Sequence, residues 1–108
     1  MGFEHESAFT PPLDSPAMER LLTCLKRPLA WSLLRAGQDG PTHVLRFAYA
    51  AGVPPVWEED FLLCLSHQKL YLLLLLHYPT AEQEQTVLAW LQHSLRASEI
   101  SGVEFQEP

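Results

Sequence analysis

The sequence has few cysteines and no motif typical of catalysis. Cys24 and Cys64 are the only two cysteines, and they lie 40 residues apart. They are not paired at zinc-site spacing, and they cannot form the disulfide framework of a small secreted domain. No glycine-rich phosphate loop and no H-E-x-x-H pattern occur. We therefore expect no catalytic residue, no metal site and no cofactor.

Basic residues are also scarce. The chain has 7 lysines and arginines against 13 acidic residues, a net charge of −6, and the basic residues are scattered. No basic stripe exists that could follow a phosphate backbone or an anionic membrane, so we expect neither direct nucleic-acid binding nor membrane binding. The first six residues are acidic and lack the apolar region of a secretory signal, so we expect a cytoplasmic protein.

Apolar residues, in contrast, are abundant for a chain of 108 residues. The apolar fraction is 47% and the charged fraction 19%, whereas a small domain needs a large polar surface. The longest apolar segment is residues 70–76, which reads LYLLLLL. It is too short to span a bilayer, which takes about 20 apolar residues. This composition favours apolar surface that another chain covers.

Apolar spacing predicts helices along most of the chain. Ser15 and Pro16 suit a helix start, and Met18, Leu21, Leu22 and Leu25 then share one helical face. Helical patterns continue at 29–36 and at about 41–51, with a turn at residues 38–40. A last helix begins near Thr80, which with Gln83 matches a capping box.

The segment 57–78 can be read as one long helix, because leucine has high helix propensity. A strand at 70–76 is the alternative, since a short apolar run does not distinguish the two. A break at residues 66–68 into two shorter helices also remains open. The sequence thus predicts an all-α fold, a compact single domain of four to five helices with a long central leucine-rich helix. We expect a flexible N-terminal tail at 1–14, a helical domain at 15–98 and an acidic C-terminal tail at 99–108.

Read as a helix, residues 57–78 have one face that the other helices would cover and one left over. The left-over face predicts a protein interface formed by Trp57, Leu63, Leu70, Tyr71 and Leu74. Tryptophan and tyrosine are frequent anchors of such interfaces. The face could serve a homodimer of the free protein, in which the same patch is used twice, or a different protein.

In its size, its acidity, its predicted helicity and its apolar run at 70–76, the chain resembles the small bacterial antiactivators that capture LuxR-type quorum-sensing receptors. The resemblance implies a small regulatory protein. Its partner would be a transcriptional regulator, which it would prevent from dimerising or binding DNA.

Two further hypotheses come from other functional classes. One is a chaperone or assembly subunit of a bacterial secretion system or another multiprotein complex. The other is a small enzyme with a hidden thiol site, because His67 follows Cys64 at one-turn helical spacing. A buried, inert thiol explains Cys64 between two leucines better.

Overall fold

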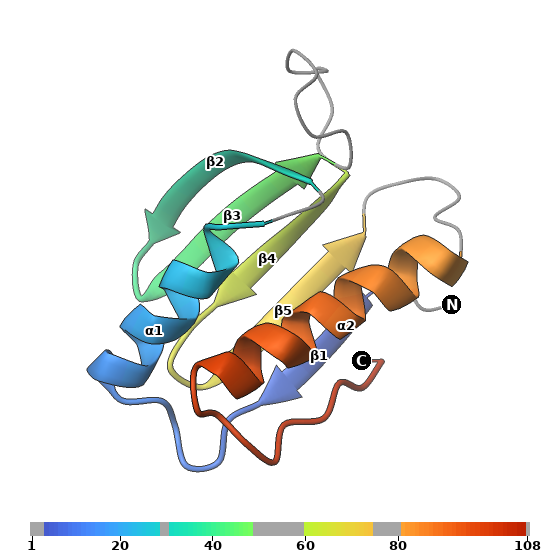
Figure 1. Ribbon diagram of the computed structural model, residues 1–108. Helices are drawn as coiled ribbons and strands as arrows, with labels where there is room; N and C mark the ends of the chain where they lie inside the picture. Colours follow the sequence, from blue (N-terminus) through green and yellow to red (C-terminus); the bar gives the residue numbers. More distant parts are fainter. Residues whose placement is uncertain (1–3, 29–30, 49–59, 75–80, 108) are drawn as a thin grey trace.

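The computed structural model describes residues 4–28, 31–48, 60–74 and 81–107, and an antiparallel β-sheet dominates it. The five strands lie side by side in the order β1-β5-β4-β3-β2 (Figure 1). The elements are, in chain order, β1 (Glu4–Ala8), α1 (Ser15–Leu25), β2 (Ser32–Asp39), β3 (Thr42–Ala48), β4 (Phe61–Leu65), β5 (Lys69–Leu74) and α2 (Ala81–Ala97). The predicted all-α fold is therefore wrong, and the chain is an α+β protein.

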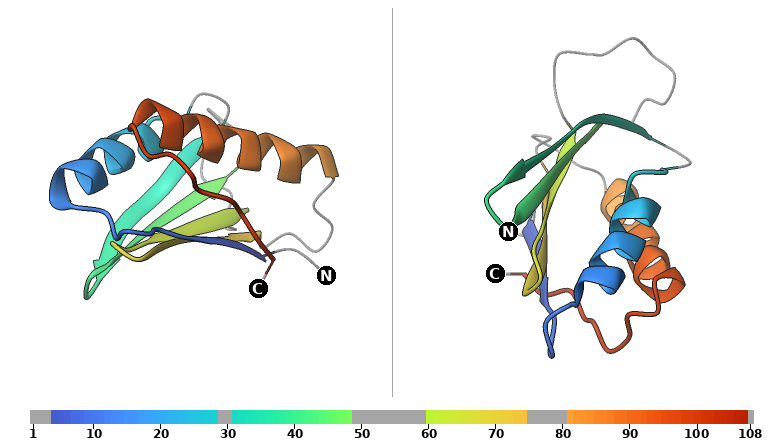
Figure 2. Two further views of the ribbon diagram at one scale, coloured as in Figure 1. Left: turned by 90° about the horizontal axis from the view of Figure 1, so that it is seen from below. Right: turned by 90° about the vertical axis from the view of Figure 1, so that its left-hand side faces the viewer.

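Both helices pack against the same face of the sheet, as the two side views show (Figure 2). The molecule thus has two layers, one of helices and one of strands. The core lies between them and contains leucines of α1, α2 and the three central strands. No element of the described residues covers the opposite face of the sheet.

The two helices are the elements that the apolar spacing predicted correctly. α1 begins one residue earlier than expected, because Asp14 is the N-cap and its Oδ1 accepts a 2.9 Å hydrogen bond from the Ala17 amide. Met18, Leu21 and Leu25 face the sheet. In α2 the buried positions Val87, Leu91 and Leu95 form the predicted stripe. Thr80, the predicted cap, lies outside the described residues.

A hairpin of β2 and β3 replaces the helices predicted at 29–36 and 41–51. Asp39 pairs with Thr42, so the loop consists of Gly40 and Pro41. Gly40 has a φ of +59°, and proline fixes its own φ near −65°, which together suit a type II′ hairpin turn. The turn predicted at residues 38–40 is therefore the turn of a hairpin, and its geometry favours strands on both sides.

A second hairpin, of β4 and β5, replaces the long helix predicted at 57–78. Buried and half-buried residues alternate from Phe61 to Leu65 and again along β5. Such a period of two belongs to a strand with one face in the core. The polar residues 66–68 form the turn, with Ser66 and Lys69 joined by a 2.9 Å backbone hydrogen bond. The strand alternative for 70–76 is confirmed as far as Leu74, where the described segment ends.

Both segments predicted as tails contain residues that take part in the fold. β1 is an edge strand that pairs with β5 along its whole length. Gln106 in turn bridges to Glu6 through two backbone hydrogen bonds of 2.8 Å, so the C-terminal segment runs beside β1. The side of β1 that faces the helices is polar: it carries His5, whose Nε2 lies 3.5 Å from Glu84 Oε2, and Ser7. β1 is therefore held by its backbone hydrogen bonds and contributes little apolar burial.

Among the described residues, no helix is long and apolar enough to cross a membrane.

Candidate functional site

The face of the sheet opposite the helices carries a group of apolar side chains. Cross-strand partners share a face of a sheet, and the register joins Leu62 to Leu73, Cys64 to Tyr71, and Val44 to Cys64. All of these residues are only partly buried, while their neighbours along each strand face the core. We call this group the open-face patch; it consists of Val44, Leu62, Cys64, Tyr71 and Leu73.

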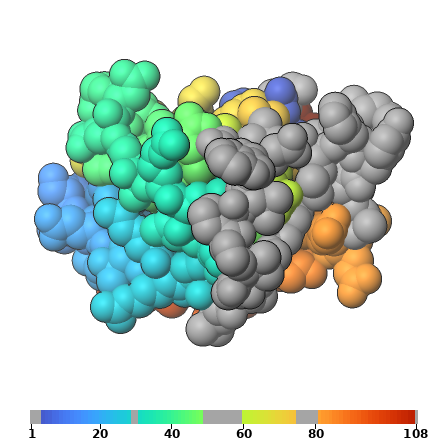
Figure 3. Space-filling view, turned by 90° about the horizontal axis from the view of Figure 1, so that it is seen from above, coloured from blue at the N-terminus to red at the C-terminus, as the bar shows by residue number. Residues whose placement is uncertain are grey.

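The open face lies on the outside of the molecule. In the space-filling view, which shows the sheet from its edge, green, yellow and dark-blue atoms of the strands lie along the upper margin, and light-blue atoms of α1 lie below them at the left (Figure 3). Leucines on an exposed sheet face are unfavourable for a monomer, because that face is ordinarily polar in an antiparallel sheet. The patch is thus the feature of the described fold that most needs a functional explanation.

Charged side chains flank the patch on both sides. On the β1 side, Glu4 and Glu6 face outward, and Glu6 lies 3.7 Å from the Lys69 ammonium. The Glu4 carboxylate accepts a hydrogen bond from the Tyr71 hydroxyl, and the pKa of Tyr71 is raised, first by burial and then by these acidic neighbours. On the other side, Arg35 of β2 pairs in register with Arg46 of β3. An acidic flank and a basic flank therefore border one apolar centre.

The structure divides the residues predicted to form an interface between the two faces of the sheet. Leu63 and Leu70 are 0% exposed and Leu74 is 2% exposed, so all three pack in the core and present no surface to a partner in this fold. Tyr71 lies on the open face. Trp57 falls outside the described residues.

The helical interpretation missed Leu62, Leu73, Cys64 and Val44. A period of two, with residues 62, 64, 71 and 73 on one face, was the signal that could have found most of them.

Cys64 and His67 do not form a nucleophile–base pair. Cys64 lies in β4 on the open face, whereas His67 lies in the β4–β5 turn with its Nδ1 2.6 Å from the Leu13 carbonyl oxygen. Burial raises the pKa of the Cys64 thiol, and the nearby charges of Arg46 and Lys69 offset this only in part. A raised pKa keeps the thiol protonated near neutral pH, which is the less reactive form.

We expect Cys64 to react slowly with Ellman's reagent at neutral pH. In a Cys24→Ser variant, where only Cys64 reports, the rate should rise with pH beyond 9, because the thiolate is the nucleophile. Unfolding should accelerate the reaction at fixed pH several-fold. The pKa values of Cys64 and Tyr71 are raised in the folded protein, so both groups ionise at a lower pH in the unfolded chain. The free energy of unfolding should therefore fall as the pH rises through these pKa values. A rate at pH 7 above that of free cysteine would contradict this assignment and favour a thiol enzyme.

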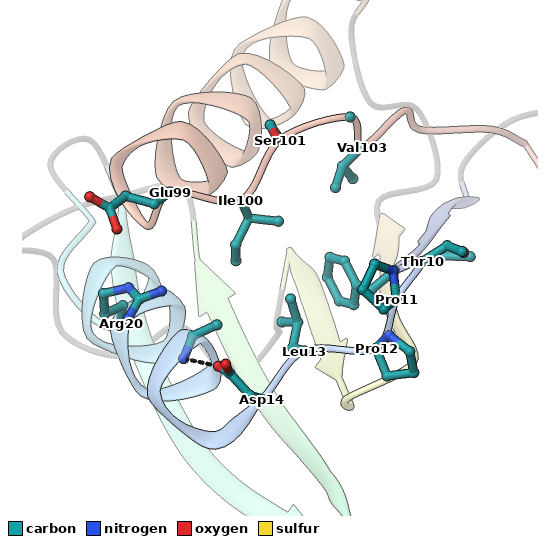
Figure 4. A pocket seen from close by; sticks show the side chains of 14 residues that line it. Thr10, Pro11, Pro12, Leu13, Asp14, Arg20, Glu99, Ile100, Ser101 and Val103 are labelled. Carbon is teal, nitrogen blue, oxygen red and sulfur yellow. Dashed lines mark hydrogen bonds between the residues drawn. The ribbon is translucent and has the colours of Figure 1, made fainter.

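A pocket of about 370 Å³ lies away from the open face, between the segment that follows β1 and the segment that follows α2 (Figure 4). Leu13, Ile100 and Val103 line its apolar part, and Arg20 and Glu99 lie at one end. Two of its polar side chains are engaged in the fold: Asp14 caps α1, and Arg20 Nε donates a 3.2 Å hydrogen bond to the Ser98 carbonyl. These hydrogen bonds therefore have a structural role, because they hold the two segments against the helices.

Within the described ranges, no group of three or more histidine, cysteine, aspartate or glutamate side chains could hold a metal ion. No family model, no curated protein and no solved structure matches the chain.

Proposed function

We propose that the chain is a small regulatory protein-binding module that uses the open-face patch to capture another protein. The observation that carries this proposal is the row of half-buried leucines, Leu62 and Leu73, beside Tyr71 on a sheet face that no described element covers. Apolar area of this kind gains free energy when a second chain covers it, at roughly 25 cal/mol per Å². Tyr71 supplies the aromatic anchor that is common at such interfaces.

The proposed mechanism is occlusion. A partner whose own apolar surface lies on the patch cannot use that surface for dimerisation or for contact with its target. A transcriptional regulator of the quorum-sensing receptor type is the partner that we propose, in keeping with the acidity and small size of the chain. The interface is a sheet face, and it replaces the helix face that the apolar run had predicted.

A chaperone or assembly subunit is the second candidate, and the outer edge of β2 favours it. β2 is the last strand of the sheet, and residues 35–39 are exposed. An edge strand can pair with an extended segment of another protein through its backbone groups. In that case a client would bind along β2, and the patch would only assist.

Photo-crosslinking in the native host tests the proposal directly. A photoreactive phenylalanine analogue at position 71 should give a discrete adduct with a different protein, which mass spectrometry then identifies. The same analogue at Ala89, an exposed position of α2, is the matched control and should give no such adduct. Adducts at an exposed β2 position such as Gln38, with none at position 71, would instead support the chaperone. If neither sheet position gives an adduct with another protein, partner capture is wrong.

A further inference from the structure

One row of the open face carries charges of opposite sign at its two ends. The register places five residues in line across the sheet: Glu4, Leu73, Leu62, Arg46 and Arg35. Glu4 and Arg35 are exposed at the two edge strands. β4, with Leu62 and Cys64, is the central strand, with two strands on either side. The row is therefore acidic at one end, apolar in the middle and basic at the other end.

We propose that the free protein covers its open-face patch with a second copy of this chain, in a symmetric dimer whose two-fold axis runs along β4. The inference rests on the proposed function only in taking the open-face patch as the contact surface. A rotation about this axis places β1 of one protomer over β2 of the other and β5 over β3, while each row stays in register. Glu4 of each protomer then faces Arg35 of its partner, twice per dimer. Leu62 and Cys64 lie near the axis and face their own copies.

The arrangement agrees with how sheets pack. Two sheets that stack face to face keep their strands within about 30° of each other and about 10 Å apart, with apolar side chains between them. Charges at the rim then set the register and exclude wrong orientations more than they add affinity.

The other face-to-face symmetry is less favourable. A two-fold axis perpendicular to the strands, through the row of Glu6, Tyr71, Cys64 and Val44, would place Glu6 against its own copy. Like charges opposite each other disfavour such a contact. The position of Glu6 thus selects the axis along β4.

Self-association and partner capture use the same surface, so they compete. A dimer protects the leucines of the patch when no partner is present, and a partner must displace the second copy before it binds. The free protein is thereby kept soluble without losing its binding surface.

A charge-exchange experiment tests the geometry. The chain has a mass of 12.3 kDa, and sedimentation equilibrium on the purified protein should give twice this value. Glu4→Arg alone and Arg35→Glu alone should each weaken the dimer, on the order of tenfold in dissociation constant, since two contacts per dimer become repulsive. An equimolar mixture of the two variants should recover wild-type affinity, because both contacts in the mixed dimer again join opposite charges.

Matched controls carry the same charge changes on the exposed side of α2. Glu82→Arg and Arg96→Glu are the two controls, and both should dimerise like the wild type. A second readout uses Cys64: a bismaleimide of about 10 Å span should join two protomers of Cys24→Ser and none of Cys64→Ser.

Three results would overturn the dimer. They are a monomeric wild type at 100 µM (on the order of a hundredfold above a micromolar dissociation constant), a mixture no tighter than the single variants, and controls as weak as the variants. Each leaves the proposed capture of a different protein untouched, because the crosslink from position 71 to that protein tests it separately. Adducts from position 71 that contain only this chain would support the dimer and reject capture.

Discussion

Leu72→Ala is expected to lower the free energy of unfolding by about 2–5 kcal/mol, whereas Leu73→Ala, one residue along, should lower it by less than about 1 kcal/mol. The two side chains are chemically identical and belong to the same apolar run. Leu72 is 0% exposed between the sheet and the helices, while Leu73 lies half-buried on the open face. Truncating Leu72 leaves a cavity in a closely packed core, whereas solvent fills the space left by Leu73.

Guanidinium unfolding followed by circular dichroism measures both variants, at low protein concentration so that self-association does not enter. The comparison extends along β5, because Leu70→Ala should behave like Leu72→Ala and Tyr71→Ala like Leu73→Ala. Equal losses at positions 72 and 73 would contradict the strand, since a helix buried on all sides would lose similar stability at both.

Phe61→Ala is the second substitution with a large expected effect, about 3–5 kcal/mol of unfolding free energy. Phe61 is fully buried and stacks on Phe47, with ring centroids 4.8 Å apart. Trp31 meets Phe61 edge-on at 5.7 Å, and Trp90 of α2 meets Trp31 edge-on at 5.0 Å. Aromatic pairs at such distances stabilise beyond their buried area, and this cluster ties α2 to β3 and β4.

Near-ultraviolet circular dichroism distinguishes loss of this cluster from general loss of stability. Phe61→Ala should weaken the tryptophan bands under conditions where far-ultraviolet signals still show folded protein, because Trp31 and Trp90 lose the ring that orders them. Phe61→Leu retains most of the apolar volume and is the control, with an expected loss well below that of Phe61→Ala. Tryptophan bands that stay unchanged in Phe61→Ala would show that the cluster does not order these rings.

The helices could be predicted because the residues that specify each helix lie close together in the sequence. Pro16 and the spacing of Met18, Leu21 and Leu25 predict α1 without reference to other elements, although the N-cap is Asp14 and not Ser15. The strands could not be predicted in the same way. High helix propensity of leucine and a run without polar breaks both favoured a helix at 70–76, yet propensity is a weak preference that tertiary packing overrides. The useful local signal was the polar turn at residues 66–68 between two apolar segments of strand length.

The residues of the candidate site also depended on whether the leucine-rich segment is a helix or a strand. A helix and a strand distribute the same leucines over different faces, so the wrong period assigned Leu63, Leu70 and Leu74 to the surface, when they are in fact the core. Side chains alternate between the two faces along β5, which places Tyr71 on the open face beside Leu62 and Leu73. The idea that apolar surface remains to be covered came from composition and does not depend on this choice.

The sequence by itself determined that the chain is rich in apolar residues for its length, that its charge is acidic and dispersed, and that amphipathic helical patterns begin near Ser15 and near Thr80. Only the tertiary structure decided which leucines meet the helices and which remain outside. It did so through strand pairing, because the register of β4 and β5 with β1 and β3 joins residues that are far apart in the chain. The spacing of residues within one segment carries no information about such pairing partners. Only the pairing of the strands places an acidic edge and a basic edge on either side of the open-face patch.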